Sequence, residues 1–442
     1  MPRQTERGDM RMRFGWILAV LASAAAPGAA WGGGASIFEQ GTPRNGVATA
    51  GSGAFADDAS TSFFNPAGMA RLDRSQFMLG TQVVKAKLRF DPDDETSPSL
   101  GRNDGGDAAG WAPGLSSYYA HRLGDRWRLG VSLTTPVAGA VDYDNDWLGR
   151  YYVTEVSLLS LNLNPAVSYK VNDWLSVGAG ANVAYATMDY TLKLPNLVPG
   201  STSGDGKLKL DDLDDVAGGW NLGVLFEPWD GTRIGLTYRS ELEFDLDGDF
   251  DTSNIGSILT DLGLTEGNVT SEFDVPQLAA LSVYQQLTDE IAILLDVMWT
   301  DWSTFEYTPI TLSTTPGAGI DIPRNWKDTW RYAIGLEARV APRLLFQLGF
   351  SYDSSPIRSG KTALPDLPVT RIYKFSTGFK YELNENIVLG LTYMYADLGS
   401  VPVDFTTFKA FPNGGLRLKG DYKRNDLHMV GFSINWKTGK PI

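Results

Sequence analysis

From Ser75 to Trp436 the chain repeats one pattern, in which apolar and polar residues alternate with a period of two. This period is typical of β-strands with two unlike faces. After residue 32 no run reaches eighteen apolar residues, which excludes a helical membrane protein. The pattern predicts fourteen strands, at 75–90, 113–123, 126–141, 155–171, 174–194, 217–227, 231–247, 272–287, 290–305, 327–340, 343–355, 370–383, 386–400 and 421–436.

The alternation is regular enough to assign the two faces of several strands. In 343–355 and 386–400 the large apolar residues have one parity, and the small or polar residues have the other. A soluble sandwich would turn such a stripe toward a core, but fourteen strands without longer buried runs favour a lipid-facing wall. The residues predicted to face lipid are Leu344, Phe346, Leu348, Phe350, Tyr352, Ile387, Leu389, Leu391, Tyr393 and Tyr395.

The connections between these segments alternate between short and long. Short turns such as Gly124-Asp125 and Asn172-Asp173 alternate with long stretches rich in Asp, Gly, Pro and Ser. In single-chain bacterial barrels the short turns are periplasmic, the long loops are extracellular and the strand number is even. The sequence therefore predicts an all-β fold, a 14-stranded antiparallel transmembrane β-barrel, over residues 75–442. Long connections are expected near 91–112, 142–154, 195–216, 248–271, 306–326, 357–369 and 401–420.

Two segments precede the predicted barrel. Residues 1–32 combine a basic start, an apolar core and small residues, which is the pattern of a secretory signal peptide. Residues 33–74 lack the alternation and are expected to form a compact segment of their own. Within it, Phe63 and Phe64 offer an apolar anchor, and Asn65-Pro66 predicts a turn.

Charge and cysteine content narrow the class of protein. The formal net charge of −14 argues against nucleic acid as a partner. The absence of cysteine excludes a disulfide framework and a lipoprotein anchor. Together with the 13 tryptophans, 18 tyrosines and 48 glycines, this composition is what we expect of a β-barrel in the outer membrane of a Gram-negative bacterium.

The sequence shows no convincing catalytic or metal-binding constellation, and no cofactor is expected. The two histidines, His121 and His428, lie on predicted strands and are expected in the wall or at a rim. Aspartate pairs such as Asp93-Asp94 fall in predicted outer loops. They are interpreted as solvated charge, with weak cation binding as the alternative.

Parity places two groups of charged residues inside the predicted barrel. Interior cations beside carboxylates form salt-bridge networks, but a free cation could instead bind an anionic head group. Both interpretations are open for Lys327 and Arg331. The groups are Lys327, Arg331, Glu337 and Arg339 in one strand, and Arg239, Glu241 and Glu243 in another.

The third predicted strand contains a fault. Pro136 removes one ladder donor and Gly139 tolerates a bulge, so the wall is expected to bend or open between Thr134 and Gly139.

One predicted outer loop has helical apolar spacing. A short helix there would offer an apolar surface at the outer mouth, or would simply pack on a neighbouring loop. The residues on its apolar face are Ile255, Ile258, Leu259 and Leu262.

Several motifs, in this order, give the chain a resemblance to a known family over nearly its whole length. They are ADDAS with FFNPAGMARL, LNLNPAVSYKVNDWLSVGAGANVAYA, GGWNLGVLFEP with GLTYRSEL, WTDWSTF with NWKDTWRYAIG, and FSYDSSPI. The chain thereby resembles the FadL/TodX family of outer-membrane transporters for long-chain fatty acids and other hydrophobic compounds.

The resemblance implies a fourteen-stranded barrel whose N-terminal segment, residues 33–74, forms a hatch in the lumen. It implies an interior pocket formed by Asn65, Thr135 and Lys327, and release of the substrate sideways at the kinked third strand. Phe63, Phe64 and Arg331 are further candidates for the pocket. The gate would comprise Asn65, Pro66, Ala67, Pro136 and Gly139.

One departure from the family pattern bears on the substrate. An inward arginine of the family is replaced here by Leu192, which leaves room for a neutral substrate such as an aromatic hydrocarbon. The expected function is passive uptake of fatty acids or similar hydrophobic compounds, and the chain is not expected to be an enzyme. The alternatives are a carrier of neutral hydrocarbons, a lipid hydrolase and a diffusive porin. The expected partners are the substrate, outer-membrane lipid or lipopolysaccharide and the barrel-assembly machinery, and the expected state is a monomer.

Overall fold

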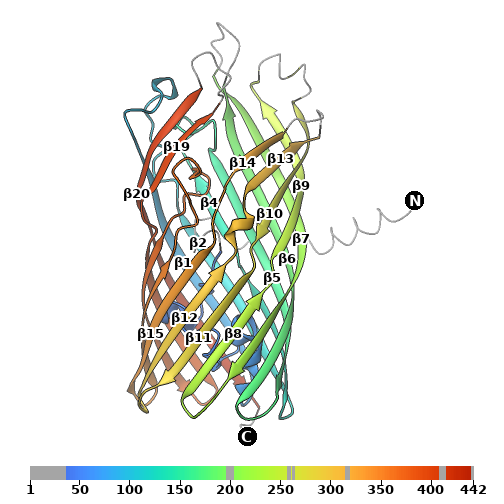
Figure 1. Ribbon diagram of the computed structural model, residues 1–442, viewed down its shortest axis with the longest axis vertical. Helices are drawn as coiled ribbons and strands as arrows, with labels where there is room; N and C mark the ends of the chain where they lie inside the picture. The colour runs from blue at the N-terminus through green and yellow to red at the C-terminus, as the bar shows by residue number, and fades with distance from the viewer. Residues whose placement is uncertain are drawn as a thin grey trace, which may run out of the picture.

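The computed structural model describes residues 36–195, 204–255, 260, 264–313, 319–407 and 415–439. Over these residues the chain forms one antiparallel sheet that closes on itself, because β1 (Ser75–Pro92) pairs with both β2 (Trp111–Leu123) and β20 (Leu416–Thr438). The result is a tall barrel with tilted strands (Figure 1). The predicted all-β barrel is confirmed.

The described wall contains twenty strand segments. Six pairs of consecutive segments continue one another between the same neighbours, so the wall has fourteen strands, as predicted. The unbroken strands are β1, β2, β5 (Glu155–Lys170), β6 (Leu175–Leu194), β7 (Gly206–Phe226), β16 (Leu344–Asp353), β17 (Ile372–Asn384) and β20. The broken strands are β3 (Trp127–Thr134) with β4 (Ala138–Asp142), β8 (Thr232–Arg239) with β9 (Leu242–Ser253), β10 (Glu266–Val275) with β11 (Leu278–Gln286), β12 (Ile291–Thr300) with β13 (Tyr307–Leu312), β14 (Gly319–Pro323) with β15 (Thr329–Ala341), and β18 (Ile387–Asp397) with β19 (Val401–Thr407).

The predicted outward faces are confirmed in β16 and β18. Leu348 and Leu391 are among the exposed apolar residues of the outer surface, whereas Gln347 and Thr392 are buried on the inner side. This arrangement follows from the pleat, which sends successive side chains to opposite faces of the sheet.

Above the lipid-facing belt the polarity of the wall reverses. In the lower half of β1, Gln76 and Gln82 point inward while Phe77 is exposed outside. In the upper half, Leu88 and Phe90 are buried inside, and the alternate positions are lysine and arginine. The upper lumen is therefore apolar and its outer wall is charged, as expected for a wall that stands in water.

The strands extend farther than predicted. β7 starts at Gly206, and its residues 207–211 pair with residues 249–253 of β9, although 195–216 and 248–271 were predicted as connections. β13 and β14 lie within 306–326, and β19 lies within 401–420. The prediction was wrong there because the inward apolar residues are separated by acidic ones, so the composition resembles that of a polar loop.

Residues 36–74, here called the N-terminal segment, lie inside the lower half of the barrel (Figure 1). The segment contains η1 (Pro43–Val47), α2 (Thr61–Phe64) and η2 (Pro66–Arg71), and β1 begins directly after it. η1 packs against β16, β17 and β18, while η2 packs against β5, β6 and β7. The remaining helices, η3 (Pro98–Leu100) and η4 (Trp302–Thr304), lie between strands. Among the described residues, no helix is long and apolar enough to cross a membrane.

Inward-facing glycines in the wall make room for the N-terminal segment. At Gly178 an added Cβ would lie 2.5 Å from the backbone nitrogen of Ala67, and at Gly349 it would overlap the backbone of Val47. A contact this close leaves no space for a side chain, so these positions require glycine. The glycines that meet the segment in this way are Gly80, Gly130, Gly178, Gly223, Gly235, Gly335, Gly349 and Gly378.

Replacing Gly349 by alanine should loosen the N-terminal segment at a cost of about 1–3 kcal/mol, the usual penalty for overpacking. The measurement is the rate at which trypsin cleaves at Arg44 in detergent, with heat-modifiable gel mobility as the check that the barrel is folded. Gly218→Ala is the matched control, because an added Cβ at Gly218 meets no atom within 4 Å. Equal cleavage rates in the two variants would show that close contact with the wall does not hold the segment.

Candidate functional site

The third wall strand is interrupted between Thr134 and Ala138, where the sequence predicts a fault. Below the interruption, β3 pairs with β2 up to Ser117 and Leu133. Above it, the described pairing of β4 is with β5 alone, and Gly139 lies opposite Leu158. At the end of β4, the Asp142 N–H donates a hydrogen bond to the Ala108 carbonyl at 2.9 Å. This bond joins β4 to the chain just before β2 and so closes the gap on its outer side.

The start of the N-terminal segment covers this interruption from inside. Ser36 forms a β-bridge with Val137, and the Ile37 N–H donates to the Pro136 carbonyl at 2.7 Å. The side chain of Gln40 donates to the Thr135 carbonyl at 2.9 Å and accepts from the Thr135 N–H at 3.1 Å. The backbone groups of Thr135 and the Pro136 carbonyl are thus bonded to the N-terminal segment, whereas the Val137 N–H donates to Ser160 Oγ of β5 and its carbonyl accepts from the Ser160 N–H.

Asn65 lies against β7, three wall strands along from the interrupted strand. Its Nδ2 donates to the carbonyls of Gly53 at 2.6 Å and Val224 at 3.1 Å. Its Oδ1 accepts from the Ala67 N–H at 3.1 Å and caps η2, which starts at Pro66. The sequence placed Asn65 beside Thr135 and Lys327, whereas its hydrogen bonds join η2 to the β7 wall.

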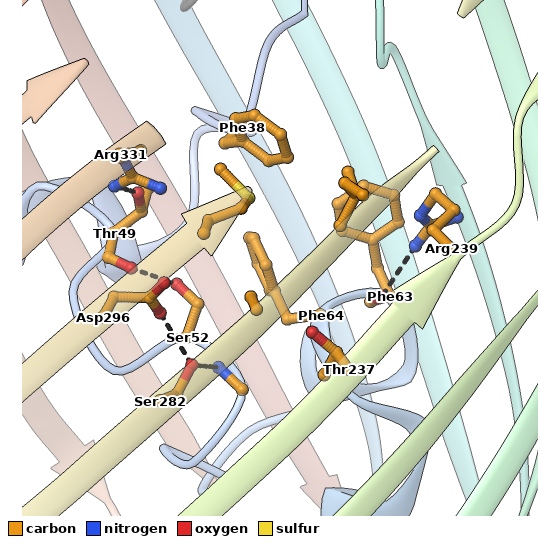
Figure 2. A pocket seen from close by; sticks show the side chains of 14 residues that line it. Phe38, Thr49, Ser52, Phe63, Phe64, Thr237, Arg239, Ser282, Asp296 and Arg331 are labelled. Carbon is orange, nitrogen blue, oxygen red and sulfur yellow. Dashed lines mark hydrogen bonds between the residues drawn. The ribbon is translucent and has the colours of Figure 1, made fainter. Parts of the chain in front are cut away.

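Phe63 and Phe64 line a cavity of about 50 Å³ between the N-terminal segment and the wall. Their rings pack edge to face, with centroids 5.1 Å apart. Figure 2 shows Arg331 of β15 at one side of the cavity and Arg239 of β8 at the other, with aromatic rings between them. The other lining residues are Phe38, Thr49, Ser52, Gly53, Thr237, Leu278, Ala280, Ser282, Asp296 and Met298.

Arg331 is fixed by the N-terminal segment and by the wall. Its Nη2 donates to the Ala48 carbonyl and to the Thr49 hydroxyl, and its Nε lies 3.5 Å from Asp353. The structure thus supports the salt-bridge interpretation of this inward arginine.

Glu39 continues the same network. It is 2% exposed and lies 2.8 Å from Lys374, whose Nζ is also 3.1 Å from Asp353. Burial on its own would raise the pKa of Glu39, but Lys374 and Arg331 hold that pKa below its usual value.

A second group of ion pairs holds the bottom of the N-terminal segment. Arg44 pairs with Asp57 at 2.7 Å and with Asp58 at 3.1 Å, and Lys380 of β17 also pairs with Asp57. These charges border a polar cavity of about 280 Å³, which Glu337 also lines. Burial would raise the pKa of Asp57, but Lys380 and Arg44 keep it below its usual value.

Three of the predicted inward charges point elsewhere. Lys327 is exposed and the preceding Trp326 is buried, because the buried parity changes between Trp326 and Thr329, in the stretch that joins β14 to β15. Glu241 and Glu243 lie on the side opposite Leu242 and Phe244, which are buried inside. The alternation of inward and outward residues in β8 does not continue in the same phase in β9, because Ser240 and Glu241 lie outside both strands.

A larger cavity, of about 670 Å³, lies at the extracellular end of the lumen. Its lining is mostly apolar and includes Leu192, the residue that departs from the family pattern. Arg417 and Asp404, an ion pair at 2.8 Å, lie at its border. The apolar and aromatic lining residues are Tyr151, Tyr152, Tyr190, Leu192, Ile310, Ile320, Ile322, Pro323, Leu364 and Phe405.

Sequence reasoning missed part of this outer end. Arg324 and Asp366 form a buried bidentate pair, with Nη–Oδ distances of 2.9 and 2.6 Å. Burial works against the charge of Arg324, but Asp366 raises its pKa above the usual value. Both residues fall in predicted loops. The one available signal was the alternation of Ile320, Ile322 and Arg324 with polar residues.

Both histidines lie on the outer surface. His121 Nδ1 is 3.0 Å from the Tyr119 hydroxyl and 3.4 Å from Ser75 Oγ, and His428 Nδ1 is 2.9 Å from the Tyr393 hydroxyl. Within the described ranges, no group of three or more histidine and acidic side chains is arranged to hold a metal ion.

The predicted helix at the outer mouth falls largely outside the described residues. Ile255 is described and partly buried, whereas Ile258, Leu259 and Leu262 are not among the described residues.

Comparison with known proteins identifies similar chains. The profile of the family described as outer membrane protein transport protein (OMPP1/FadL/TodX) matches residues 23–436. The long-chain fatty acid transport protein of Escherichia coli is 27% identical over 404 residues, which cover 83% of this chain and 87% of the relative.

Solved structures share the fold. A Pseudomonas aeruginosa FadL homologue superposes with a TM-score of 0.82 at 22% identity and covers 91% of this chain and 99% of its own. The Ralstonia pickettii toluene transporter TbuX has a TM-score of 0.66 at 17% identity and covers 91% of this chain and 100% of its own.

The lowered pKa of Glu39 gives the N-terminal segment a predictable pH dependence. Its ion pair contributes stability fully above the unfolded pKa, near 4.3, and the contribution is lost as pH falls through the lower pKa of the folded state. Hydrogen exchange in residues 36–74 should therefore increase, relative to the barrel strands, from pH 6 to pH 3 after correction for intrinsic rates.

Glu39→Gln should reduce this pH dependence and raise exchange already at pH 6. Asp230→Asn, at an exposed turn, is the control. An unchanged pH profile in Glu39→Gln would rule out this ion pair as its source.

Proposed function

Because the chain belongs to the outer membrane protein transport family (OMPP1/FadL/TodX), we propose that it takes up long-chain fatty acids or similar hydrophobic compounds through the outer membrane. The observation that carries the proposal is the polarity of the lumen, which is apolar in its upper half and closed below by the N-terminal segment. The relative named as a fatty acid transport protein, at 27% identity, supports this substrate class.

The outer cavity is the proposed site of capture. Transfer of apolar surface out of water releases roughly 25 cal/mol per Å², so a lining of tyrosine, leucine and isoleucine binds an acyl chain without a specific polar contact. The buried apolar residues of the upper lumen, among them Phe90, Tyr143, Trp147 and Tyr422, then continue the apolar path downward.

The inner cavity is the proposed second binding site, and the N-terminal segment is the proposed hatch. At about 50 Å³ the cavity holds a small head group but not an acyl chain. Phe38 and Phe64 are partly exposed toward it, and their side chains would have to turn to admit the chain.

The interruption at residues 135–137 is the proposed lateral exit. Thr135 is bonded to Gln40 and the Pro136 carbonyl to Ile37, so displacement of Ile37 and Gln40 would open the wall between β2 and β4 toward lipid. Pro136 and Gly139 border this opening, whereas Asn65, Pro66 and Ala67 would act by anchoring the hatch to the wall at β6 and β7. No energy source is invoked, because the solute moves from water to lipid along its own free-energy gradient.

Three alternative functions predict different observations. A carrier of neutral aromatic hydrocarbons is favoured by Leu192 in the outer cavity. A hydrolase would use Ser75 and His121, but the Tyr119 hydroxyl is closer to the same histidine nitrogen; esterase activity in detergent that His121→Ala abolishes would favour it. A diffusive porin would conduct ions across a planar bilayer, which a closed hatch prevents.

Locking the hatch to the wall should stop release. Ser36 and Val137 are bridge partners, a geometry with Cα atoms about 4.5–5.5 Å apart that suits a disulfide. In the double variant Ser36→Cys/Val137→Cys, oxidation should reduce uptake of labelled oleate by cells at least tenfold, and reduction should restore it. The protein has no cysteine of its own, so no other disulfide can form within it.

The two single-cysteine variants are the controls, since neither can form this disulfide. Normal uptake by the oxidised double variant, with the bond verified by mass spectrometry, would refute lateral exit at residues 135–137. That result would not contradict the proposal that the barrel transports hydrophobic compounds.

A charge in the outer cavity should weaken capture. Leu192→Asp removes apolar contact area and adds a carboxylate, so the oleate concentration for half-maximal uptake should rise about tenfold, corresponding to roughly 60 Å² of lost apolar contact. Leu287→Asp, at an exposed periplasmic turn, is the control. An unchanged half-maximal concentration in Leu192→Asp would mean that capture occurs elsewhere.

A further inference from the structure

We propose that Arg239 binds the acid group of the substrate, which makes the substrate an anionic amphiphile with an apolar tail rather than a neutral hydrocarbon. The proposal rests on the proposed transport function and assigns a specificity residue within it.

Arg239 ends β8 and points into the inner cavity (Figure 2). Its Nη1 donates to Asn182 Oδ1 at 2.5 Å, and its Nη2 donates to the Phe63 carbonyl at 2.9 Å. The guanidinium carbon lies 4.4 Å from the centre of the Phe63 ring. These two hydrogen bonds use two of the five N–H groups of a guanidinium, so donors are left for a ligand.

The charge of Arg239 has no carboxylate to balance it among the described residues. Four other cations between the N-terminal segment and the wall do have one: Arg331 and Lys374 pair with Asp353, and Arg44 and Lys380 pair with Asp57. A cation in an apolar site without a counter-ion is costly. A ligand carboxylate would remove this cost and form charge-assisted hydrogen bonds.

Two further interior arginines also lack a carboxylate within hydrogen-bond reach, but their positions differ. Arg128 donates to the backbone carbonyls of Leu72, Gly124 and Trp127 near the periplasmic rim. Arg233 lies 3.6 Å from the centre of the Tyr284 ring, beside the polar cavity that holds Asp57. Neither lines the apolar inner cavity.

The surroundings of Arg239 match a head group joined to an apolar tail. The cavity around it is lined by Phe38, Phe64, Leu278, Ala280 and Met298. The one carboxylate of the lining, Asp296, is bonded to Ser282 Oγ at 2.7 Å on the Arg331 side, away from Arg239 (Figure 2). The side of the cavity that carries uncompensated positive charge is therefore the Arg239 side.

Arg331 is not equivalent. The Ala48 carbonyl, the Thr49 hydroxyl and Asp353 already surround its guanidinium. Both arginines line the cavity, but the charge of Arg331 is already paired with Asp353, whereas Arg239 has no such partner among the described residues. In the outer cavity Leu192 stands where the family pattern has an inward arginine. Arg239 would supply a positive charge from a different strand, β8, and at a different depth in the lumen.

The experiment compares two ligands that differ only in the head group. Binding of oleate and of oleyl alcohol to the full-length protein in detergent is measured for wild type, Arg239→Met and Arg239→Lys. Arg239→Met keeps the length and apolar contacts of the side chain but removes the charge. Heat-modifiable gel mobility checks that each barrel is folded.

Loss of a charged hydrogen bond predicts that Arg239→Met raises the Kd for oleate about 10- to 100-fold. The Kd for oleyl alcohol should change by no more than about twofold, and Arg239→Lys should recover part of the oleate affinity. Only this split between the two ligands supports the proposal, because a structural role of Arg239 would weaken both.

Three results would overturn the proposal. Equal weakening of both ligands would assign Arg239 a structural role, and unchanged oleate binding would show that no acid group binds there. A wild-type protein that binds oleyl alcohol but not oleate would refute the anionic substrate and keep hydrophobic transport. Failure to bind any of these ligands would instead refute the proposed function together with this inference.

Discussion

The requirement that backbone N–H and C=O groups be paired in hydrocarbon governs this structure. An unpaired group facing lipid costs several kcal/mol, so the sheet has to close through β1 and β20. The interruption at Thr135–Val137 is tolerated because Gln40 and Ile37 bond to Thr135 and Pro136 from inside, and Ser160 of β5 bonds to Val137. Closure of the sheet and the position of the N-terminal segment therefore both satisfy the need to pair backbone N–H and C=O groups, and a change in one affects the other.

The interior divides into two zones that hold the N-terminal segment and the solute by different forces. In the lower zone, inward glycines bring backbone against backbone, and the ion pairs of Glu39 and Asp57 fix the position of the segment. In the upper zone, Phe90 and Tyr422 belong to an apolar cluster in which contacts are non-directional. Arg239 ends β8 just before Leu242 and Phe244 of this apolar cluster, and among the described residues no carboxylate pairs with it.

The sequence predicted the parts of the fold that lipid constrains. β16 and β18 have one face in hydrocarbon, so their alternation is clean and their faces are confirmed. Glu241, Glu243 and Lys327 were misplaced because the parity on which the assignment depended changes at Ser240–Glu241 and again between Trp326 and Thr329. The Glu39–Lys374 pair joins residues 335 positions apart, and no local pattern indicates such a contact. The wall fault at Pro136 was predictable, because proline and glycine act locally.

The reversed polarity of the upper wall also defines the height of the apolar part of the lumen. From Val84 to Phe90 the inner face of β1 stays apolar over six residues, which at the rise and tilt of barrel strands is a height of about 15 Å. Over that height the lumen is lined with apolar side chains, while Lys85, Lys87 and Arg89 on the outer face of the same strand suit water. The apolar column thus continues the hydrocarbon zone of the barrel beyond its lipid-facing belt, so the height of the charged outer wall sets the length of the apolar interior.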